Sequence, residues 1–405
     1  MIVKSNFIEK FILLIVVSSI FMPTIPLGLS IRIDDFLALF LIPLVILAKP
    51  NFKTNRFFFS YLLILLSFIT STFYGYLFLK VPFSIRDVNE LFRMLKPLLI
   101  IVAVSYCNLR TLANFLNSFF KVGAIFLILL GFLEYFNVLS FRALFYSLYG
   151  FEFGNMGGRS VLTAGNPNIA AALVLYFMIY FLQRMLLTGD KILSVFKILF
   201  LLVVLLMTSS RTALVVFVVV LLASMYFHRK HNKILSFAII TFCILLAFPL
   251  LQYFDYLTIG FVTFTDGKNT SMLIRYQQWS DAINLFKQSP IIGWGPAKDL
   301  HTSVVDNEYF LLLRRYGVIG FVLVINFLLS FIFVFLKRKR QIDLLDTRTK
   351  SIAYTTILSL LMVFIIMITN NFFSGYQLMP LFVVMIAVTE GGLKIFARDN
   401  KIIDE

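Results

Sequence analysis

The chain of 405 residues is 60% hydrophobic and 14% charged, and its mean hydropathy is +0.92. Soluble domains are about half apolar and about a quarter charged, so this composition excludes an ordinary soluble domain. The formal net charge is +16, but the basic residues lie between apolar runs rather than on one soluble face. This pattern argues against nucleic acid as a partner and favours anionic lipid headgroups.

Many of the apolar runs approach the ~20 residues that are needed to cross a bilayer. We therefore predict an all-α, polytopic integral membrane protein with about twelve transmembrane helices. The first run follows two lysines, as in a signal peptide, but no small-residue cleavage site comes after it, so we interpret it as a membrane span. The predicted spans are, in chain order, Phe7–Leu27, Phe36–Ala48, Phe57–Leu79, Leu91–Tyr106, Val122–Val138, Ile169–Leu187, Ile192–Met207, Thr212–Phe227, Ile234–Phe254, Val318–Leu336, Ile352–Thr369 and Leu378–Gly392.

Lysine and arginine predict the orientation, because they remain in cytoplasmic loops. The two densest basic clusters are HRKHNK (His228–Lys233) and KRKR (Lys337–Arg340), and two predicted spans and a long loop separate them. Both clusters therefore fall on the same side, and we expect both chain termini to be cytoplasmic.

Nine basic residues then lie outside or near outer helix ends, against this rule. A buried charge within a membrane protein is costly, so a functional role is the default hypothesis for such residues. The alternative is that some of them only extend to lipid headgroups. The nine are Lys80, Arg86, Arg93, Lys96, Arg159, Arg211, Arg275, Arg314 and Arg315.

Two segments bring polar residues to outer helix ends before the long loop. Arg159 and Asn168 lie just before a span, in the segment GGRSVLTAGNPNIAAALVLYF. Arg211 lies in a short turn between two spans, in the segment TSSRTALVVF. This turn leaves little room for a loop, so we expect Arg211 to project into the mouth of the helix bundle. The alternative is that Ser209, Ser210 and Arg211 only satisfy the ends of the two helices.

The long outer loop, residues 254–317, divides the predicted transmembrane regions 1–253 and 318–405. Within it, SMLIRYQQWSDAINLFKQSP predicts an amphipathic helix that lies flat in the outer interface or covers the bundle as a lid. Arg275 lies on the polar face of this helix. The apolar stripe consists of Met272, Tyr276, Trp279, Ile283 and Phe286.

HTSVVDNEYFLLLRRYGVIG (301–320) combines charges with an apolar helix. We expect Asp306 to cap a helix that ends near Gly317, with Glu308 in its first turn, so capping is the structural alternative for both acids. His301 is the only histidine on the predicted outer side. An imidazole titrates near pH 6.5, which suits proton abstraction.

The outer arginines surround a possible base at the membrane surface, and this arrangement predicts a lipid-linked pyrophosphate as ligand. Arginine matches phosphate oxygens and stays charged in a low dielectric. Glycosyl transfer outside the cytoplasm needs a lipid-linked donor, whose pyrophosphate leaving group arginines can stabilise. His301, Asp306 or Glu308 could be the base for the acceptor hydroxyl. The sequence contains no nucleotide-binding motif, no zinc-binding motif and no nucleophile elbow, so we expect neither a cofactor nor a metal.

Three segments resemble the signatures of the O-antigen polymerase and ligase superfamily. They are GGRSVLTAGNPNIAA, TSSRTALVVF, and the stretch from RYQQW to RRYGVIG, which contains a W-x-x-A helix, a P-x-x-G-x-G turn, a histidine and D-N-E-Y in order. The resemblance implies a GT-C-like helical fold and a metal-independent, inverting transfer of glycan from undecaprenyl pyrophosphate, on the outer leaflet of the bacterial cytoplasmic membrane.

By position, Arg159 and Arg211 match the phosphate-contacting arginines of the family, and Arg275 and His301 match its loop residues. We add Asn168 and Arg314 to the expected substrate-binding set. The ligase branch typically has asparagine closely after the histidine, whereas D-N-E-Y intervenes here, which favours a repeat-unit polymerase. The alternatives are a ligase that transfers glycan to lipid A core and a lipid-linked oligosaccharide flippase. Chain-length regulators and a flippase are expected partners.

Overall fold

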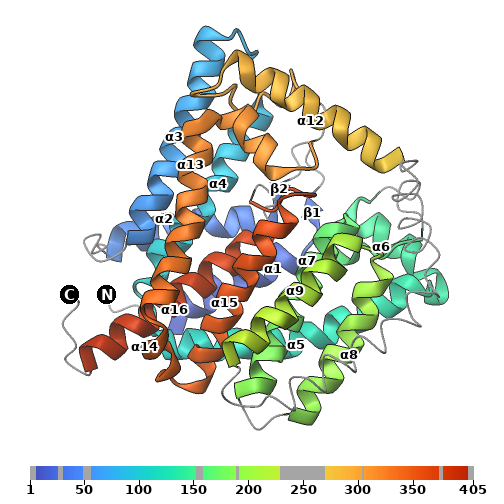
Figure 1. Cartoon of the computed structure of the whole chain (residues 1–405), viewed down its shortest axis with the longest axis vertical. Coiled ribbons are helices and arrows are strands. Elements are labelled where there is room, and N and C mark those ends of the chain that lie inside the picture. The colour runs from blue at the N-terminus through green and yellow to red at the C-terminus, as the bar shows by residue number, and fades with distance from the viewer. Residues whose placement is uncertain are drawn as a thin grey trace. The chain divides into compact units, whose positions relative to one another are not determined.

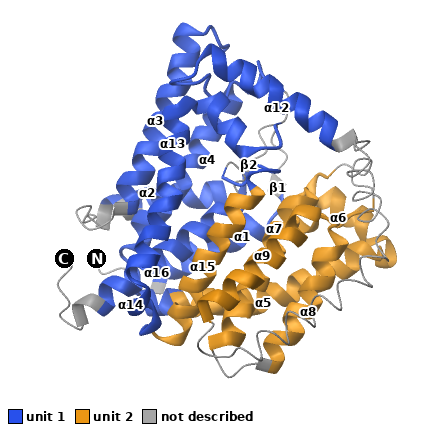
Figure 2. Ribbon diagram, in the orientation of Figure 1, with its two compact units in different colours: residues 1–112, 271–345, 367–405 blue, residues 113–270, 346–366 orange. Residues whose placement is uncertain are grey.

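The computed structural model describes residues 6–25, 31–48, 56–151, 158–187, 191–228, 270–302, 305–373 and 377–399. These residues are mainly helical, which confirms the predicted all-α class (Figure 1). Their strands are the two-residue pair β1 (Thr24–Ile25) and β2 (Ile31–Arg32), antiparallel with Thr24 opposite Arg32. The chain divides into two compact units, which Figure 2 shows in different colours.

Unit 1 comprises residues 1–112, 271–345 and 367–405. Within it, α3 packs against α13 and α4, and α4 also packs against α1, α2 and α16. Its helices are α1 (Asn6–Phe21), α2 (Ile33–Ala48), α3 (Arg56–Phe78), α4 (Ile85–Val104), α12 (Thr270–Gln288), α13 (Glu308–Lys337), α14 (Lys339–Asp343) and α16 (Met379–Asp399).

Unit 2 comprises residues 113–270 and 346–366. Helix α7 is central to it, because nearly all of its side chains are buried and it packs against α8, α9 and α15. The start of α7 follows from its sequence, since the Asn166 side chain accepts the Asn168 N–H at 2.8 Å and Pro167 takes the first helical position. The elements are α5 (Leu109–Tyr135, mostly in this unit), η2 (Val138–Ser140), α6 (Phe141–Tyr149), η4 (Leu162–Ala164), α7 (Pro167–Leu187), α8 (Lys191–Met207), α9 (Arg211–His228) and α15 (Thr347–Ile366).

Seven helices of the described residues are long and apolar enough to cross a membrane, which supports the predicted polytopic membrane protein. They overlap seven of the predicted spans and are α3, α5, α7, α9, α13, α15 and α16. Four further predicted spans coincide with α1, α2, α4 and α8, of 16, 16, 20 and 17 residues. The remaining one, 234–254, lies outside the described residues. The number twelve therefore stays a prediction.

Aromatic side chains join α3 to α13 in unit 1. Tyr61 and Phe57 meet Phe327 edge-on, with ring centroids 5.5 and 6.1 Å apart, and Phe68 stacks on Tyr316. Such pairs contribute about 1 kcal/mol each beyond the area that they bury. They hold α13, which carries several of the predicted site residues, along α3.

Two of the nine outer basic residues belong to a buried charge cluster. Lys96 is only 2% exposed and forms ion pairs with Asp34 and with Asp35, the latter at 2.6 Å. Arg93 pairs with Asp35 at 3.5 Å, and Arg32 pairs with Asp34 at 3.1 Å. The alternative that Lys96 extends to lipid headgroups is therefore wrong. Removing one partner of such a buried pair costs about 3–5 kcal/mol, so the cluster joins α2 to α4.

The packed face of α12 differs in part from the predicted apolar stripe. In α12 the packed side holds Trp279 and Ala282, which meet Val305 and Leu311, whereas Tyr276 of the predicted apolar stripe is exposed. Most of the predicted stripe is therefore on the packed side, since Met272, Trp279, Ile283 and Phe286 are half-buried and Tyr276 is the exposed exception.

Helix α13 begins one residue later than predicted and does not end at glycine. The side chain of Asn307, not that of Asp306, caps it by accepting the Phe310 N–H at 3.1 Å. Gly317 interrupts the helix with non-helical angles (φ 60°, ψ −168°), and α13 then continues to Lys337. Asn307 and Asp306 are equally good capping residues by type, so the sequence does not distinguish them.

Candidate functional site

In unit 2, the two predicted polar segments meet. The Arg159 guanidinium donates to the Thr208 carbonyl at 2.9 Å and to the Ser209 carbonyl and the Asn168 side chain at 3.4 Å. Asn168 also accepts the Ser210 hydroxyl at 2.9 Å. Arg211 follows directly as the first residue of α9. Arg159, Asn168 and Arg211 are thus brought to one place, as predicted.

Part of this arrangement satisfies the helix ends, as the structural alternative predicted. The Thr208 and Ser209 carbonyls lie at the C-terminal end of α8, where a cation is favourable. Ser209 has a left-handed backbone (φ 53°), which makes the turn between α8 and α9 tight. Both arginines remain half-buried, so they are not simply extended into solvent.

Glu134 positions the loop that carries Arg159, and the sequence analysis missed it. This carboxylate is fully buried and accepts the N–H groups of Val161 and Leu162, both at 2.9 Å, and the Tyr146 hydroxyl at 3.0 Å. An acid inside the otherwise apolar sequence of α5 is the signal that could have identified it.

In unit 1, the start of α13 holds the segment 367–373. The Glu308 N–H donates to the Met367 carbonyl at 2.9 Å, and the Asn307 side chain donates to the Ile368 carbonyl at 2.9 Å. The fully buried Glu308 carboxylate accepts the Phe373 N–H at 3.0 Å. Glu308 therefore has a structural partner beyond the helix dipole.

The P-x-x-G-x-G turn pairs with the kink in α13. The N–H groups of Trp294 and Gly295 donate to the carbonyls of Arg314 and Arg315 at 3.1 and 2.7 Å, and the Val318 N–H donates to Pro290 at 2.8 Å. At Gly317 a side chain would strike the backbone of Ile291. Glycine allows both the backbone angles of the kink and the close approach of the turn.

His301 and Arg314 lie beside this turn with unsatisfied nitrogen atoms. The imidazole meets the Trp294 ring edge-on at 5.0 Å, and its Nε2 is buried without a hydrogen-bond partner among the described residues. Arg314 is only 2% exposed, and its Nη1 also has no hydrogen-bond partner within the described ranges. Burial, and secondly the Arg314 charge, lower the pKa of His301 below its usual 6.5. The imidazole is therefore neutral at neutral pH and can accept a proton.

Arg275 and Asp306 form a weaker pair. Their closest side-chain atoms are 3.9 Å apart, so the contact is an ion pair at the limit of distance. Burial raises the pKa of Asp306 above its usual 3.8, and Arg275 opposes this shift. The predicted site residues of unit 1 thus surround the first two turns of α13.

Other buried polar atoms near these elements were not predicted from the sequence. The amide nitrogen of Asn370, which is 5% exposed, and the amide oxygen of Asn371 have no hydrogen-bond partner among the described residues. The same is true of the Gln278 amide oxygen and the Trp279 Nε1 in α12. Two adjacent asparagines between apolar helices were the available signal.

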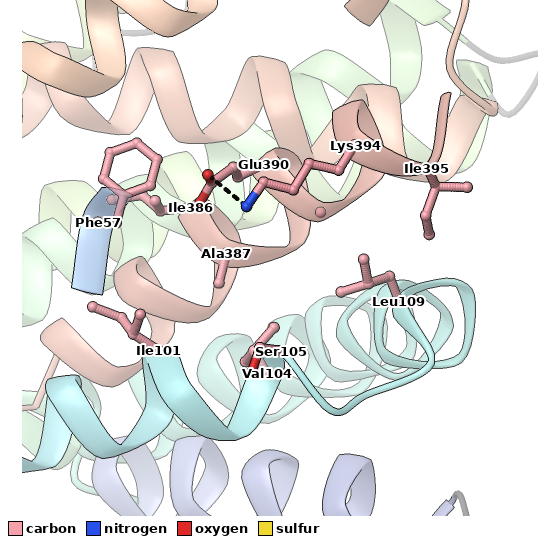
Figure 3. A pocket seen from close by; sticks show the side chains of 11 residues that line it. Phe57, Ile101, Val104, Ser105, Leu109, Ile386, Ala387, Glu390, Lys394 and Ile395 are labelled. Atoms are coloured by element: carbon pink, nitrogen blue, oxygen red, sulfur yellow. Dashed lines mark ion pairs between the residues drawn. The ribbon is translucent and has the colours of Figure 1, made fainter. Parts of the chain in front are cut away.

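The predicted residues fall into two sets, each within its own unit: Arg159, Asn168 and Arg211 in unit 2, and Arg275, His301, Asp306, Glu308 and Arg314 in unit 1. A separate cavity of about 190 Å³ lies in unit 1 among α3, α4 and α16, and none of the predicted residues lines it (Figure 3). Its polar lining includes Lys394 and Glu390, which are paired at 3.1 Å. Among the described residues, no group of three or more metal-ligating side chains could hold a metal ion.

Comparison with known proteins finds one family match. Residues 196–325, about a third of the chain, match the family described as O-antigen ligase. The match runs from α8 into α13, so it includes Arg211, His301 and Arg314 but excludes Arg159 and Asn168. No curated protein matches the chain. The family match confirms the predicted resemblance to the O-antigen polymerase and ligase superfamily.

Proposed function

We propose that the chain is a polysaccharide repeat-unit polymerase of the bacterial cytoplasmic membrane. It transfers a growing glycan from undecaprenyl pyrophosphate to the terminal sugar of a lipid-linked repeat unit on the outer face. The observation that carries this proposal is the buried Arg314, whose Nη1 has no hydrogen-bond partner among the described residues, beside a His301 with an unsatisfied Nε2.

Arg314 supports an anionic ligand because a buried guanidinium nitrogen without a hydrogen-bond partner is costly. A phosphate group offers the counter-charge and a pair of oxygen atoms that the planar guanidinium can bind with two hydrogen bonds. A lipid-linked pyrophosphate brings such an anion to a membrane protein while its tail stays in the bilayer. The Arg314 charge would be compensated when this ligand is bound.

His301 is the base that the geometry favours. Its neutral Nε2 takes the proton of the acceptor hydroxyl while the hydroxyl oxygen attacks the anomeric carbon of the donor. The bond between that carbon and the pyrophosphate oxygen breaks, and the bonding electrons leave with the pyrophosphate. Arg314 stabilises the negative charge that develops on the leaving group. The transition state has oxocarbenium character.

Asp306 and Glu308, the other predicted bases, take supporting roles in this proposal. Glu308 accepts the Phe373 N–H at 3.0 Å and so holds the segment 367–373. Asp306 lies next to Arg275 and keeps this arginine at the site. The Arg314 charge acts on His301, whereas the arginine that acts on Asp306 is Arg275.

The cluster of unit 2 offers a second anion-binding arrangement. Arg211 begins α9, and the N-terminus of a helix attracts anions. Ser210, in the turn before α9, and Arg159 both donate to the Asn168 side chain at the start of α7. We propose that Arg159, Asn168 and Arg211 bind a pyrophosphate of a lipid-linked substrate within unit 2.

A ligase that transfers the finished glycan to a different acceptor is the second candidate, because the matched family is described as O-antigen ligase. The products in a deletion strain distinguish the two activities. Single lipid-linked repeat units accumulate when a polymerase is absent, whereas polymer on the lipid carrier accumulates when a ligase is absent.

Arg314→Gln tests the proposal in that deletion strain. We expect this variant to insert normally but to restore no long-chain glycan, since it removes the cation that stabilises the leaving group; losses of ~10²–10³-fold are typical for such groups. The matched control is Arg338→Gln at the other end of α13. Normal chain length with Arg314→Gln would overturn the proposal. Gel sizing of the glycan and immunoblotting of the membrane fraction are the measurements.

A further inference from the structure

Glu90 is a buried acid that the proposed reaction does not use. It lies in the second turn of α4 and is only 1% exposed. Its carboxylate contacts Lys298 Nζ at 2.6 Å and Arg315 Nη1 at 2.7 Å, and it accepts the Tyr316 hydroxyl at 3.1 Å. These three donors come from the segment after the P-x-x-G-x-G turn and from α13. One carboxylate therefore joins three elements of unit 1.

A second acid of α4 strengthens the same connection. Asp87, one turn before Glu90, accepts the Lys298 N–H at 3.0 Å and the Tyr76 hydroxyl at 3.2 Å. The side chain of Arg86 also pairs with Asp299 at 3.3 Å. The first two turns of α4 thus hold residues 298–299. His301 follows two residues later, and its N–H donates to the Ala297 carbonyl at 2.8 Å.

The connection places two neighbouring arginines in different environments. Successive residues of an α-helix point about 100° apart, so Arg314 and Arg315 leave α13 in different directions. Arg315 faces Glu90 and is paired with it. Arg314 is buried with an Nη1 that lacks a hydrogen-bond partner in the described part of the chain. Glu90 thus contacts Arg315 directly, while its charge acts on Arg314 only through space and leaves the Nη1 of Arg314 for a ligand.

We propose that Glu90 is a positioning residue: it neutralises Arg315 and Lys298, leaves Arg314 as the cation that meets the ligand, and fixes the segment that carries His301. This inference rests on the proposed function, because the importance of Arg314 and His301 follows from that function. Glu90 itself contacts neither the reacting atoms nor the ligand.

Kinetics of Glu90→Gln test this role in the full-length protein, with lipid-linked repeat units extracted from the deletion strain as substrate. We expect kcat to fall about 10- to 100-fold, since small displacements of reacting groups have effects of this size. KM should not rise, because the uncovered charges of Arg315 and Lys298 still attract an anionic lipid. Glu90→Asp should restore part of kcat, because it keeps the charge.

Asp34→Asn is the matched control. It also removes a buried carboxylate that pairs with a lysine, but this ion pair with Lys96 joins α2 to α4 rather than α4 to the segment 298–299 or to α13. We expect Asp34→Asn to lower the thermal stability while kcat per folded molecule stays unchanged. An equal loss of kcat in both variants would show that Glu90 only stabilises the fold, which would overturn the inference.

Tryptophan fluorescence reports the position of the turn without turnover. The chain has two tryptophans, so Trp279→Phe leaves Trp294, whose ring meets His301. In this background we expect Glu90→Gln to increase the quenching of Trp294 by acrylamide and Asp34→Asn to leave it unchanged. Unchanged quenching together with unchanged kcat in Glu90→Gln would overturn the role of Glu90.

The proposed function and this inference can fail separately. Wild-type turnover in Arg314→Gln would refute the proposed function. If Arg314→Gln loses turnover but Glu90→Gln keeps the wild-type kcat, only the role of Glu90 is refuted. Should Glu90→Gln not fold, Tyr316→Phe removes one hydrogen bond from Glu90 without uncovering a charge. It should lower kcat in the same direction by a smaller factor, and wild-type kcat in both Tyr316→Phe and Glu90→Asp would overturn the inference.

Discussion

His301 and Arg314 show how residues of the same type acquire different roles from their surroundings. His301 keeps a neutral imidazole because it is partly buried beside the charge of Arg314. Arg315, the sequence neighbour of Arg314, is instead paired with Glu90 at 2.7 Å. The sequence placed both arginines among the outer basic residues and did not separate them, since the separation depends on an acid more than 220 positions away.

The lowered pKa of His301 makes a prediction about the pH dependence of the reaction. As the base, His301 must be neutral, so kcat/KM should fall only when the pH drops through a value below 6.5. Asp306→Asn should keep this acid limb, whereas the residual activity of His301→Gln should lack it. A midpoint at or above pH 6.5, or a limb that disappears with Asp306→Asn instead, would contradict the assignment. The measurement is a pH–rate profile with extracted lipid-linked repeat units.

At the scale of elements, the kink in α13 is the feature that shapes the unit 1 site. The sequence predicted a helix end near Gly317 and a new span from Val318, and the structure has a break at this position within one helix. The glycine signal was correct, but its purpose was not visible in the sequence. Gly317 permits the backbone contact between α13 and the segment 290–295. This segment lies well before Gly317 in the sequence but next to it in space.

Gly317→Ala tests this contact. Its backbone angles (φ 60°, ψ −168°) are nearly restricted to glycine, and a Cβ would strike the Ile291 carbonyl. We expect a loss of about 3 kcal/mol in the free energy of unfolding, at the upper end for a strained residue because a steric clash is added. The control is Gly150→Ala, which also has a positive φ (67°) but open space around it, and should cost about 1–2 kcal/mol. Denaturation in detergent measures both, and equal losses would contradict the role of the contact.

At the scale of the whole molecule, apolar runs predicted most helices but not which helices pack together. Hydropathy reports that a segment avoids water, and in a membrane both lipid and protein neighbours satisfy this preference. Lys96 illustrates this limit of hydropathy patterns. Its sequence context left lipid headgroups as one alternative, whereas its partners Asp34 and Asp35 lie about 60 residues earlier. Unit 1 combines residues 1–112 with 271–345 and 367–405, and a continuous sequence pattern does not reveal such pairing.

The proposed reaction also requires a definite orientation in the membrane, with the residues around Arg159 and His301 on the outer side. Single cysteines at exposed positions test this in a background without Cys107 and Cys243. Leu139→Cys reports the outer end of unit 2, since Leu139 is 98% exposed and the nearby Arg142 contacts the Gly158 carbonyl. Thr302→Cys reports the segment of His301, and Arg340→Cys reports the predicted cytoplasmic side, both at exposed positions. We expect a membrane-impermeant maleimide to label the first two in intact cells and the third only after permeabilisation. Labelling of Thr302→Cys and Leu139→Cys from opposite sides, or of both only from the cytoplasm, would contradict the proposed reaction. At least one of the two sets of arginines would then lie on the side away from the lipid-linked substrates of the outer leaflet.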